Sequence, residues 1–221
     1  MRNIEISIDE HYHVYNRGAH KRVIFHDRAD YARFLFLILH FQSTFVFEQI
    51  SRYVRRFVRH RVFDIDEEDV SQIVSDRYVE LISFCLMPNH FHLVLREVQE
   101  SGIARYMQRV LNGYTKYYNT RYKVSGHLFQ GPYKAVHISD NDQLLYLSSY
   151  IHRNPRELPR WKDIERMYEW SSYQDYADEN RWGGLLSTEI VLEQFKTKGE
   201  YEEFVQTSAA KTFGDEIDDP S

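Results

Sequence analysis

The sequence predicts an α+β protein built around an antiparallel sheet. Short segments that alternate between apolar and polar residues predict strands, and longer segments with apolar residues three or four positions apart predict helices. Their order along the chain is strand, helix, two adjacent strands, helix, strand. This order is typical of the ferredoxin-like and RRM-like arrangement, in which helices pack on one face of an antiparallel sheet. We therefore expect that fold, extended by a helical insertion and a C-terminal helical arm.

The first part of the chain predicts one strand, one helix and the insertion. Residues 11–16 predict a strand that ends at the turn-prone Asn16-Arg17-Gly18. Asp27 is expected to cap the next helix, whose apolar side comprises Tyr31, Phe34, Leu35, Ile38 and Phe41. Residues 42–76 then predict a helical insertion with an arginine-rich half and an acidic half. We interpret this insertion as a solvated surface feature rather than a DNA-binding arm.

Two adjacent strands, a long helix and a further strand follow. Residues 78–86 predict a strand, and the turn at 87–89 leads into its neighbour, so we expect a hairpin at the centre of the sheet. Ser101 is expected to cap a helix that runs to about Asn119. A glycine-rich loop then precedes a strand predicted at 133–138.

A last helix is expected at 141–154. Ser139 and Asp142 mark its predicted start, and Pro155 should end it at the preceding residue.

The strand after the turn carries His90 and His92 on either side of Phe91. Side chains two positions apart share one face of a strand, so the two imidazoles should lie together on the open face of the sheet or at its rim. Such a pair supplies two ligands of a divalent-metal site. The amide of Asn154 could complete that site, and Tyr150, one helical turn earlier, would then reach a phosphate bound there.

Length and composition describe an ordinary globular protein. The 221 residues suffice for one domain with an appended arm, and 43% of them are hydrophobic. The single cysteine, Cys85, excludes a disulfide framework and favours a reducing cytoplasm. No apolar run is long enough to span a bilayer, so no membrane partner is expected.

Charge is distributed unevenly along the chain. The formal net charge is −5, which argues against a general nucleic-acid binder. The segment from Ser101 to His137 nevertheless contains no acidic residue, and its basic residues are Arg105, Arg109, Lys116, Arg121, Lys123 and Lys134. Phosphate binding at this basic centre is therefore compatible with the overall charge.

Several motifs in this sequence resemble those of the single-tyrosine HUH transposases, and most of all the REP-associated tyrosine transposases. They are Tyr12-His13-Val14-Tyr15-Asn16-Arg17-Gly18, Leu86-Met87-Pro88-Asn89-His90-Phe91-His92, Gly126-His127-Leu128-Phe129-Gln130-Gly131, Tyr150-Ile151-His152-Arg153-Asn154-Pro155 and Trp170-Ser171-Ser172-Tyr173. They occur in the family's order across roughly residues 11–175. The insertion at 42–76 is longer than the usual connection, so no role is carried over to it.

The resemblance implies an enzyme that cuts and rejoins single-stranded DNA at hairpin or palindromic repeat elements. His90 and His92 correspond to the metal ligands, Asn154 to the third, amide-type ligand and Tyr150 to the nucleophile. The implied cofactor is Mg²⁺ or Mn²⁺, and the implied intermediate is a 5′-phosphotyrosine. DNA contacts are expected from Arg17, Arg105, Arg109, Lys116, Arg121, Lys123, His127, Gln130 and Lys134.

Three points stay open at this stage. His127 and His152 are both candidates for the base that activates the tyrosine, and structural or DNA-contact roles suit them equally. A tyrosine cluster at 117–122 also lies beside basic residues, but it has no ligand partner at suitable spacing. The alternative functions are a nucleic-acid-binding protein of the same fold that does not cut DNA, and a phosphohydrolase that uses metal-bound water.

The expected domain organisation has three parts. Residues 1–155 form the catalytic domain, residues 156–210 form a helical and aromatic extension that packs on it, and residues 211–221 form a flexible acidic tail. A monomer is favoured over a homodimer.

Overall fold

The computed structural model describes residues 5–45, 49–63 and 65–208. At its centre lies a four-stranded antiparallel sheet with the strand order β2-β3-β1-β4. The strands are β1 (His11–Arg17), β2 (Val79–Met87), β3 (His90–Glu97) and β4 (Lys134–Ile138). This order of strands and helices is that of the ferredoxin-like fold, so the predicted fold class is confirmed.

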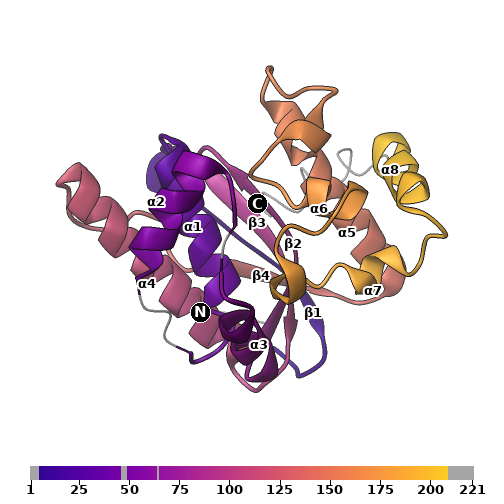
Figure 1. Ribbon diagram of the computed structural model, residues 1–221, viewed down its shortest axis with the longest axis horizontal. Coiled ribbons are helices and arrows are strands. Elements are labelled where there is room, and N and C mark those ends of the chain that lie inside the picture. The colour runs from indigo at the N-terminus through magenta and orange to yellow at the C-terminus, as the bar shows by residue number, and fades with distance from the viewer. Residues whose placement is uncertain (1–4, 46–48, 64, 209–221) are drawn as a thin grey trace.

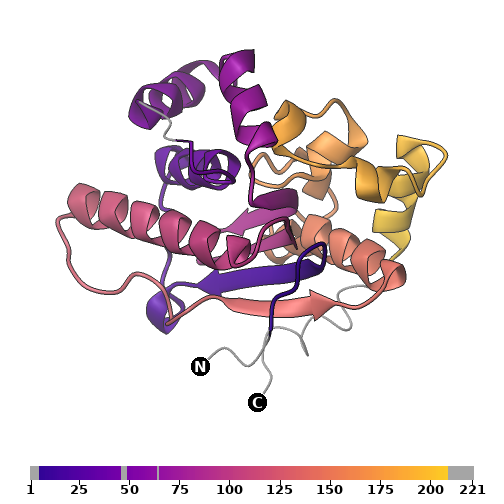
Figure 2. The same ribbon diagram turned by 90° about the horizontal axis from the view of Figure 1, so that it is seen from below.

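Helices α1 (Arg28–His40) and α4 (Gly102–Tyr122) cover one face of the sheet (Figure 2). Phe91 of β3 packs against Phe34 of α1, with ring centroids 4.9 Å apart. The Asp27 carboxylate accepts hydrogen bonds from the first turn of α1, which confirms the predicted cap. This face therefore forms the main apolar core.

The opposite face of the sheet is covered as well. Helix α5 (Asn141–Arg153) lies on it, so the sheet separates α1 and α4 from α5 (Figure 1). The expectation of an open face is therefore wrong. The expected hairpin forms from β2 and β3. Its expected place at the centre of the sheet is wrong, because β3 and β1 are the central strands and β2 lies at the edge. The crossover from β1 to β2 skips one strand position, and β3 fills that position.

The start of α4 differs from the prediction. Ser101 has a left-handed backbone, with φ of 60°, and its side chain makes no capping hydrogen bond. Instead the buried carboxylate of Glu97 accepts hydrogen bonds from the backbone N–H groups of Gly102 and Ile103, at 2.8 and 2.6 Å. A side chain at the end of β3 thus caps the helix that follows it.

The two ends of α5 also differ slightly from the prediction. Asp140 is the cap, since its carboxylate accepts from the backbone N–H of Gln143 at 2.8 Å, whereas Ser139 and Asp142 had been expected to mark the start. The α-helix ends at Arg153, and the next residues form the 3-10 helix η2 (Asn154–Glu157). The proline therefore ends the helix one residue earlier than expected.

The insertion is helical, and it packs on the domain. It contains α2 (Ile50–His60) and α3 (Glu67–Ser75). The Phe57 ring of α2 lies 5.6 Å from the Phe36 ring of α1 and 5.9 Å from the Trp182 ring, measured between centroids. In the described part of the chain, no helix has both the length and the apolar character needed to cross a membrane.

The segment after α5 covers the outer edge of β2. The backbone N–H of Leu86 donates to the carbonyl of Trp170, and that of Ser172 donates to the carbonyl of Phe84, both at 2.9 Å. An edge strand is thereby shielded from pairing with other chains. The remaining short elements of the chain are η1 (Ala19–Lys21), η3 (Glu165–Met167), α6 (Tyr173–Ala177), η4 (Gly183–Leu185), α7 (Glu189–Leu192) and α8 (Lys198–Thr207). The domain division near residue 155 stays a prediction, and the acidic tail at 211–221 lies outside the described residues.

A buried hydrogen-bond network ties α5 to this extension. The Nε2 atom of His152 lies 2.8 Å from the hydroxyl of Ser172, and its Nδ1 lies 2.6 Å from the hydroxyl of Tyr201 on α8. The Tyr201 hydroxyl also donates to the hydroxyl of Ser148, at 3.1 Å. Burial lowers the pKa of His152 to about 3, so this imidazole is neutral. Ser172 also accepts from the backbone N–H of Phe84 in β2, so the network ties α5 both to the edge of the sheet and to α8.

The cap on α4 yields a first prediction. The Glu97→Ala variant should lower the free energy of unfolding by about 1–3 kcal/mol, because two buried N–H groups lose their acceptor. The Ser101→Ala variant should change it by less than about 0.5 kcal/mol. Urea denaturation of both variants checks this, and equal losses would contradict the assignment of the cap.

Buried neutral histidines predict sensitivity to acid. Burial lowers the pKa of His40 to about 4, while its Nδ1 donates to the carbonyl of Phe36 at 2.6 Å. The unfolded chain binds a proton on His40 more readily than the folded chain does. The contribution of neutral His40 to the free energy of unfolding is therefore fully present above about pH 6.5 and is lost as the pH drops towards 4. As the pH falls from about 7.5 to 5.5, His40 alone should lower the free energy of unfolding by about 1.3 kcal/mol.

The comparison is between wild type and the His40→Leu variant, by urea denaturation at both pH values. The wild-type protein should lose more unfolding free energy than the variant over this interval. An identical loss in the two proteins would show that His40 is not buried in its neutral form.

Candidate active site

The register of the sheet places the site residues in two adjacent rows. His92 of β3 pairs with Tyr15 of β1, which in turn pairs with Lys134 of β4. His90 pairs with Arg17 in the next row. Directly paired residues share a face of the sheet, so all five side chains lie on the face that α5 covers.

His90 presents both ring nitrogens to amide oxygens. Its Nδ1 lies 2.7 Å from Oδ1 of Asn89, and its Nε2 lies 3.2 Å from Oδ1 of Asn154. The Asn89 amide is itself oriented, because its Nδ2 donates to the carbonyl of Lys21 at 3.3 Å. A neutral imidazole has only one N–H to donate. With both amide oxygens facing the ring, a cation held by Nε2 and the Asn154 oxygen would satisfy the second contact.

His92 is held by a histidine of the neighbouring strand. Its Nδ1 lies 2.9 Å from Nε2 of His13, and the two rings stack with centroids 5.1 Å apart. Both side chains are buried, and burial lowers the pKa of His13 to about 3. Only one of two facing nitrogens can carry the shared hydrogen when both rings are neutral. The tautomer of His13 therefore decides which nitrogen of His92 is available to a ligand.

Helix α5 and the residue that directly follows it bring Tyr150 and Asn154 to the two histidines of β3. The Tyr150 ring lies edge-on to His92 with centroids 5.6 Å apart, and it lies 6.4 Å from His13. The Asn154 side chain, one turn further on, meets His90. Tyr150 is 3% exposed and Asn154 is fully buried, so neither position depends on a mobile surface side chain.

A cavity of about 280 Å³ opens beside His90. Its basic lining residues are Arg17, Lys21 and Lys134, and Gln130 and the carboxylate of Glu157 also line it. A second hollow, lined by basic loop residues that include Arg22, shares Arg17, Lys21 and Gln130 with the first. The two hollows thus adjoin one another, and the basic residues in their shared lining suit contacts with a phosphate backbone.

The side chains beside this cavity fit a divalent cation. The rings of His90 and His92 lie 5.0 Å apart at 87°, and together with the Asn154 oxygen they offer nitrogen and oxygen ligands. In residues 5–45, 49–63 and 65–208, no three His, Cys, Asp or Glu side chains cluster as metal ligands, and the Asn154 oxygen is the additional donor that contacts His90. The buried Nδ2 of Asn154 has no hydrogen-bond partner among those residues, and a substrate oxygen could accept from it.

The basic residues predicted on α4 do not line this cavity. Arg109 donates to the carbonyl of Ser43 and to the hydroxyl of Tyr78, and Arg121 forms ion pairs with Asp27 and Asp30. Arg105, Lys116, Arg121 and Lys123 are exposed, and Arg109 is half-buried. They belong to the helix layer on the other side of the sheet, so any contact they make with DNA lies away from the histidines.

The two candidate bases occupy different surroundings. His152 belongs to the buried network with Ser172 and Tyr201, which gives it a structural role. His127 lies in an exposed loop and lines the second hollow. Reasoning from the sequence missed His13 and Lys21. The alternation that places Tyr15 and Arg17 on the histidine face also places His13 there, and this signal was available in the sequence.

Comparison with known proteins supports an assignment to a family. The family described as "Transposase IS200 like" matches residues 39–154, which is more than half of the chain. The fold is similar to the solved structure of a REP-associated tyrosine transposase bound to a REP hairpin, with a TM-score of 0.53. That similarity covers 86% of this chain and 92% of the other at 10% sequence identity, so it shows the fold alone. No curated protein matches the chain.

The family resemblance predicted from the motifs is thus confirmed. The matched region includes β2, β3, α4, β4 and α5, and it therefore contains both histidines, Tyr150 and Asn154. The chain belongs to the family of IS200-like transposases, and it is an enzyme that cuts single-stranded DNA to move it.

Proposed function

We propose that this protein cuts and rejoins single-stranded DNA through a covalent bond to Tyr150, at hairpin or palindromic repeat elements. The observation that carries the proposal is the position of α5. This helix presents a tyrosine edge-on to His92, at 5.6 Å between centroids. Asn154, which directly follows the helix, places its amide oxygen 3.2 Å from Nε2 of His90. A nucleophile and three potential metal ligands thereby meet beside a basic cavity.

The proposed reaction exchanges one phosphodiester for another. The hydroxyl oxygen of Tyr150 attacks the scissile phosphorus, and the bond from phosphorus to the 3′ oxygen breaks. The phenol gives up its proton, and the departing 3′ oxygen takes one up. The 5′-phosphotyrosine conserves the energy of the broken bond, so attack by another 3′-hydroxyl rejoins the strand and releases Tyr150.

His90, His92 and Asn154 would hold the metal ion, Mg²⁺ or Mn²⁺. When bound, such an ion polarises the phosphate and offsets the negative charge that develops on it. Asn89 orients the ring of His90 and His13 orients that of His92. The burial of Tyr150 and Asn154 keeps competing water away from the phenol.

The residues that line the cavity would position the DNA strand. Arg17 and Lys134 stand in the same rows of the sheet as His90 and His92, so their charges can hold phosphates on either side of the cut. Gln130, which accepts from Nε of Arg17 at 2.6 Å, fixes the direction of that guanidinium.

A hairpin partner is supported by the structural neighbour, which is bound to a REP hairpin. A monomer is the proposed form, since α5 is tied to α8 of its own chain through His152 and Tyr201. A DNA-binding protein that does not cut is the second candidate, and the buried set of Tyr150, Asn154 and the paired histidines argues against it because binding alone needs no such set.

The Tyr150→Phe variant tests the nucleophile. It removes one oxygen from a buried ring, so folding and DNA affinity should be retained while cleavage and covalent capture of single-stranded hairpin DNA are abolished. Denaturing gels with labelled DNA measure the adduct. Tyr146→Phe, one turn earlier on the same helix, is the matched control and should form adduct as the wild type does. An adduct that persists in Tyr150→Phe would refute the assignment.

The His13→Ala variant tests the support of His92. Loss of this orienting partner should weaken Mn²⁺ binding by about 10–100-fold, measured by calorimetry without DNA. His137→Ala removes an exposed histidine bound to Glu10 and serves as the control, with unchanged Mn²⁺ affinity expected. Equal Mn²⁺ affinity in the two variants would show that His13 does not support the metal site.

A further inference from the structure

Helix α2 of the insertion carries four arginines on one side. They are Arg52, Arg55, Arg56 and Arg59, and at 100° per residue they fall within an arc of about 100°. We call this set the arginine face. The buried residues Val54 and Phe57 lie on the opposite side of the helix. The helix is therefore strongly amphipathic, with its cationic side exposed to solvent.

Three members of the arginine face have no neutralising carboxylate among the residues that the structure describes. Elsewhere Arg28, Arg121 and Arg181 each bind a carboxylate. In contrast, no ion pair joins Arg52, Arg55 or Arg59 to any residue that the structure describes. Helix α2 itself contains no acidic residue. In a chain with 33 acidic and 28 basic residues, a cationic surface of this kind is available to an external anion.

The packing of α2 excludes insertion into a membrane. A basic amphipathic helix binds a bilayer through its apolar side, and here that side is already buried. The Phe57 ring lies 5.6 Å from Phe36, 5.9 Å from Trp182 and 6.4 Å from Trp170. These contacts hold the helix on α1, so the arginine face is a fixed surface rather than a mobile arm.

We propose that the arginine face binds the phosphate backbone of paired DNA, in the stem of a hairpin or in a duplex flank. Arg52 and Arg59 are separated by about 10 Å along the helix, and duplex DNA carries about one charge per 1.7 Å of its axis. Surfaces for single strands usually place exposed aromatic rings among their cations. The aromatic residues of α2, Tyr53 and Phe57, are half-buried and buried, so this surface suits backbone contacts alone.

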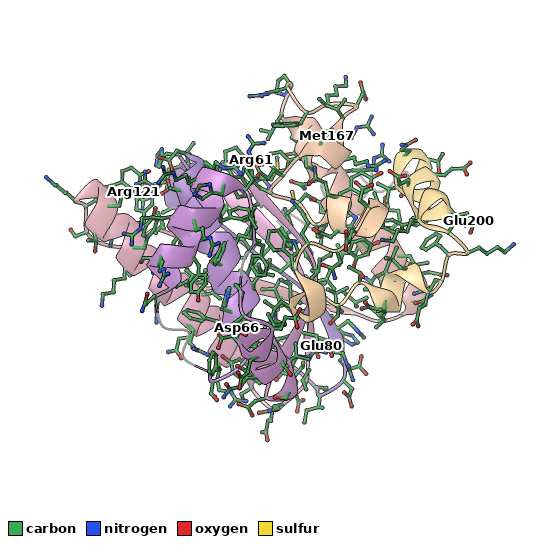
Figure 3. All side chains as sticks on the ribbon, viewed as in Figure 1. Arg61, Asp66, Glu80, Arg121, Met167 and Glu200 are labelled. Carbon is green, nitrogen blue, oxygen red and sulfur yellow. The ribbon has the colours of Figure 1, made fainter. Side chains whose placement is uncertain are left out.

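Helix α2 lies on the side of the molecule away from the candidate active site. The helix lies with α1 and α4 on the side of the sheet opposite to α5 (Figure 1). In Figure 3, Arg61 at the end of α2 lies on this side of the molecule, whereas Glu200 of α8 lies on the other side. The arginine face is thus separate from the cavity beside His90, and it holds DNA away from the cut. This inference extends the proposed function to a second DNA contact.

The test compares two double variants with the same change in charge. Arg55→Gln/Arg59→Gln neutralises half of the arginine face, and Lys196→Gln/Lys198→Gln neutralises exposed lysines near Glu200 on the far side. Fluorescence anisotropy measures the affinity of the full chain for a hairpin with a long paired stem and for an unstructured single strand, over a range of salt concentrations. Thermal unfolding checks that both variants are folded.

For the arginine variant, the slope of log affinity against log salt for the hairpin should decrease by about 1.8, since each lost phosphate contact contributes about 0.9. Its affinity for the hairpin should fall by about tenfold at low salt. Its affinity for the unstructured strand, and the formation of adduct on a short single strand, should equal those of the wild type. The lysine variant should match the wild type in every measurement.

Unchanged hairpin affinity and slope in the arginine variant would overturn the inference, as would an equal loss in the lysine variant. An equal loss of affinity for hairpin and unstructured strand would overturn the assignment to paired DNA. These outcomes are independent of catalysis, because a wild-type chain that forms no adduct contradicts the proposed function while the binding measurements still decide the role of α2.

Discussion

The contact between α5 and the histidine face of the sheet is the constraint on which the site depends. The helix must lie close enough for Asn154 to meet His90 and for the Tyr150 ring to meet His92. Two sets of buried polar contacts, one on each side of α5, hold it there. Next to Tyr150 and Asn154, the paired histidines are supported by His13 and Asn89. On the other side of the helix, His152 is bound by Tyr201 and by Ser172, which pairs with the edge of β2. Buried hydrogen-bond networks specify one arrangement, because a displaced partner leaves a polar group unsatisfied.

This dependence gives the C-terminal extension a clear physical role. Its Trp170–Ser172 segment pairs with the edge of β2, and its helix α8 supplies the tyrosine that contacts His152. The extension therefore completes the sheet edge and holds the helix that carries the proposed nucleophile. A segment that looks peripheral in the sequence is part of the support of the site.

Much of the fold could be predicted from local patterns. The strands containing Tyr15 and His92 and the helix capped by Asp27 follow from alternation, spacing and capping residues. The position of α5 could not be predicted in this way, because the sequence shows that the helix is amphipathic but not which face of the sheet it covers. The cap on α4 was missed for a similar reason: Glu97 lies in a strand, and its carboxylate reaches the helix only through the turn between them.

The residues of the candidate site could likewise be predicted in part, where they depend on local spacing, but not where they depend on contacts between distant elements. Tyr150, Asn154 and the histidines of β3 could be proposed from motifs, since their spacing within an element is visible in the sequence. The contact of His13 with His92 is not local, because it depends on the pairing of β1 with β3, and the separation of the α4 arginines from the cavity depends on the two faces of the sheet. Pairing between distant strands is what local patterns leave undetermined.

The central claim is that Tyr150 forms the covalent bond with DNA. Peptide mapping by mass spectrometry tests it most directly, after the wild-type chain has reacted with a single-stranded hairpin and Mn²⁺. We expect the nucleotide to remain attached to the peptide that contains Tyr150. A nucleotide attached instead to Tyr117, Tyr118 or Tyr122 of α4 would contradict it.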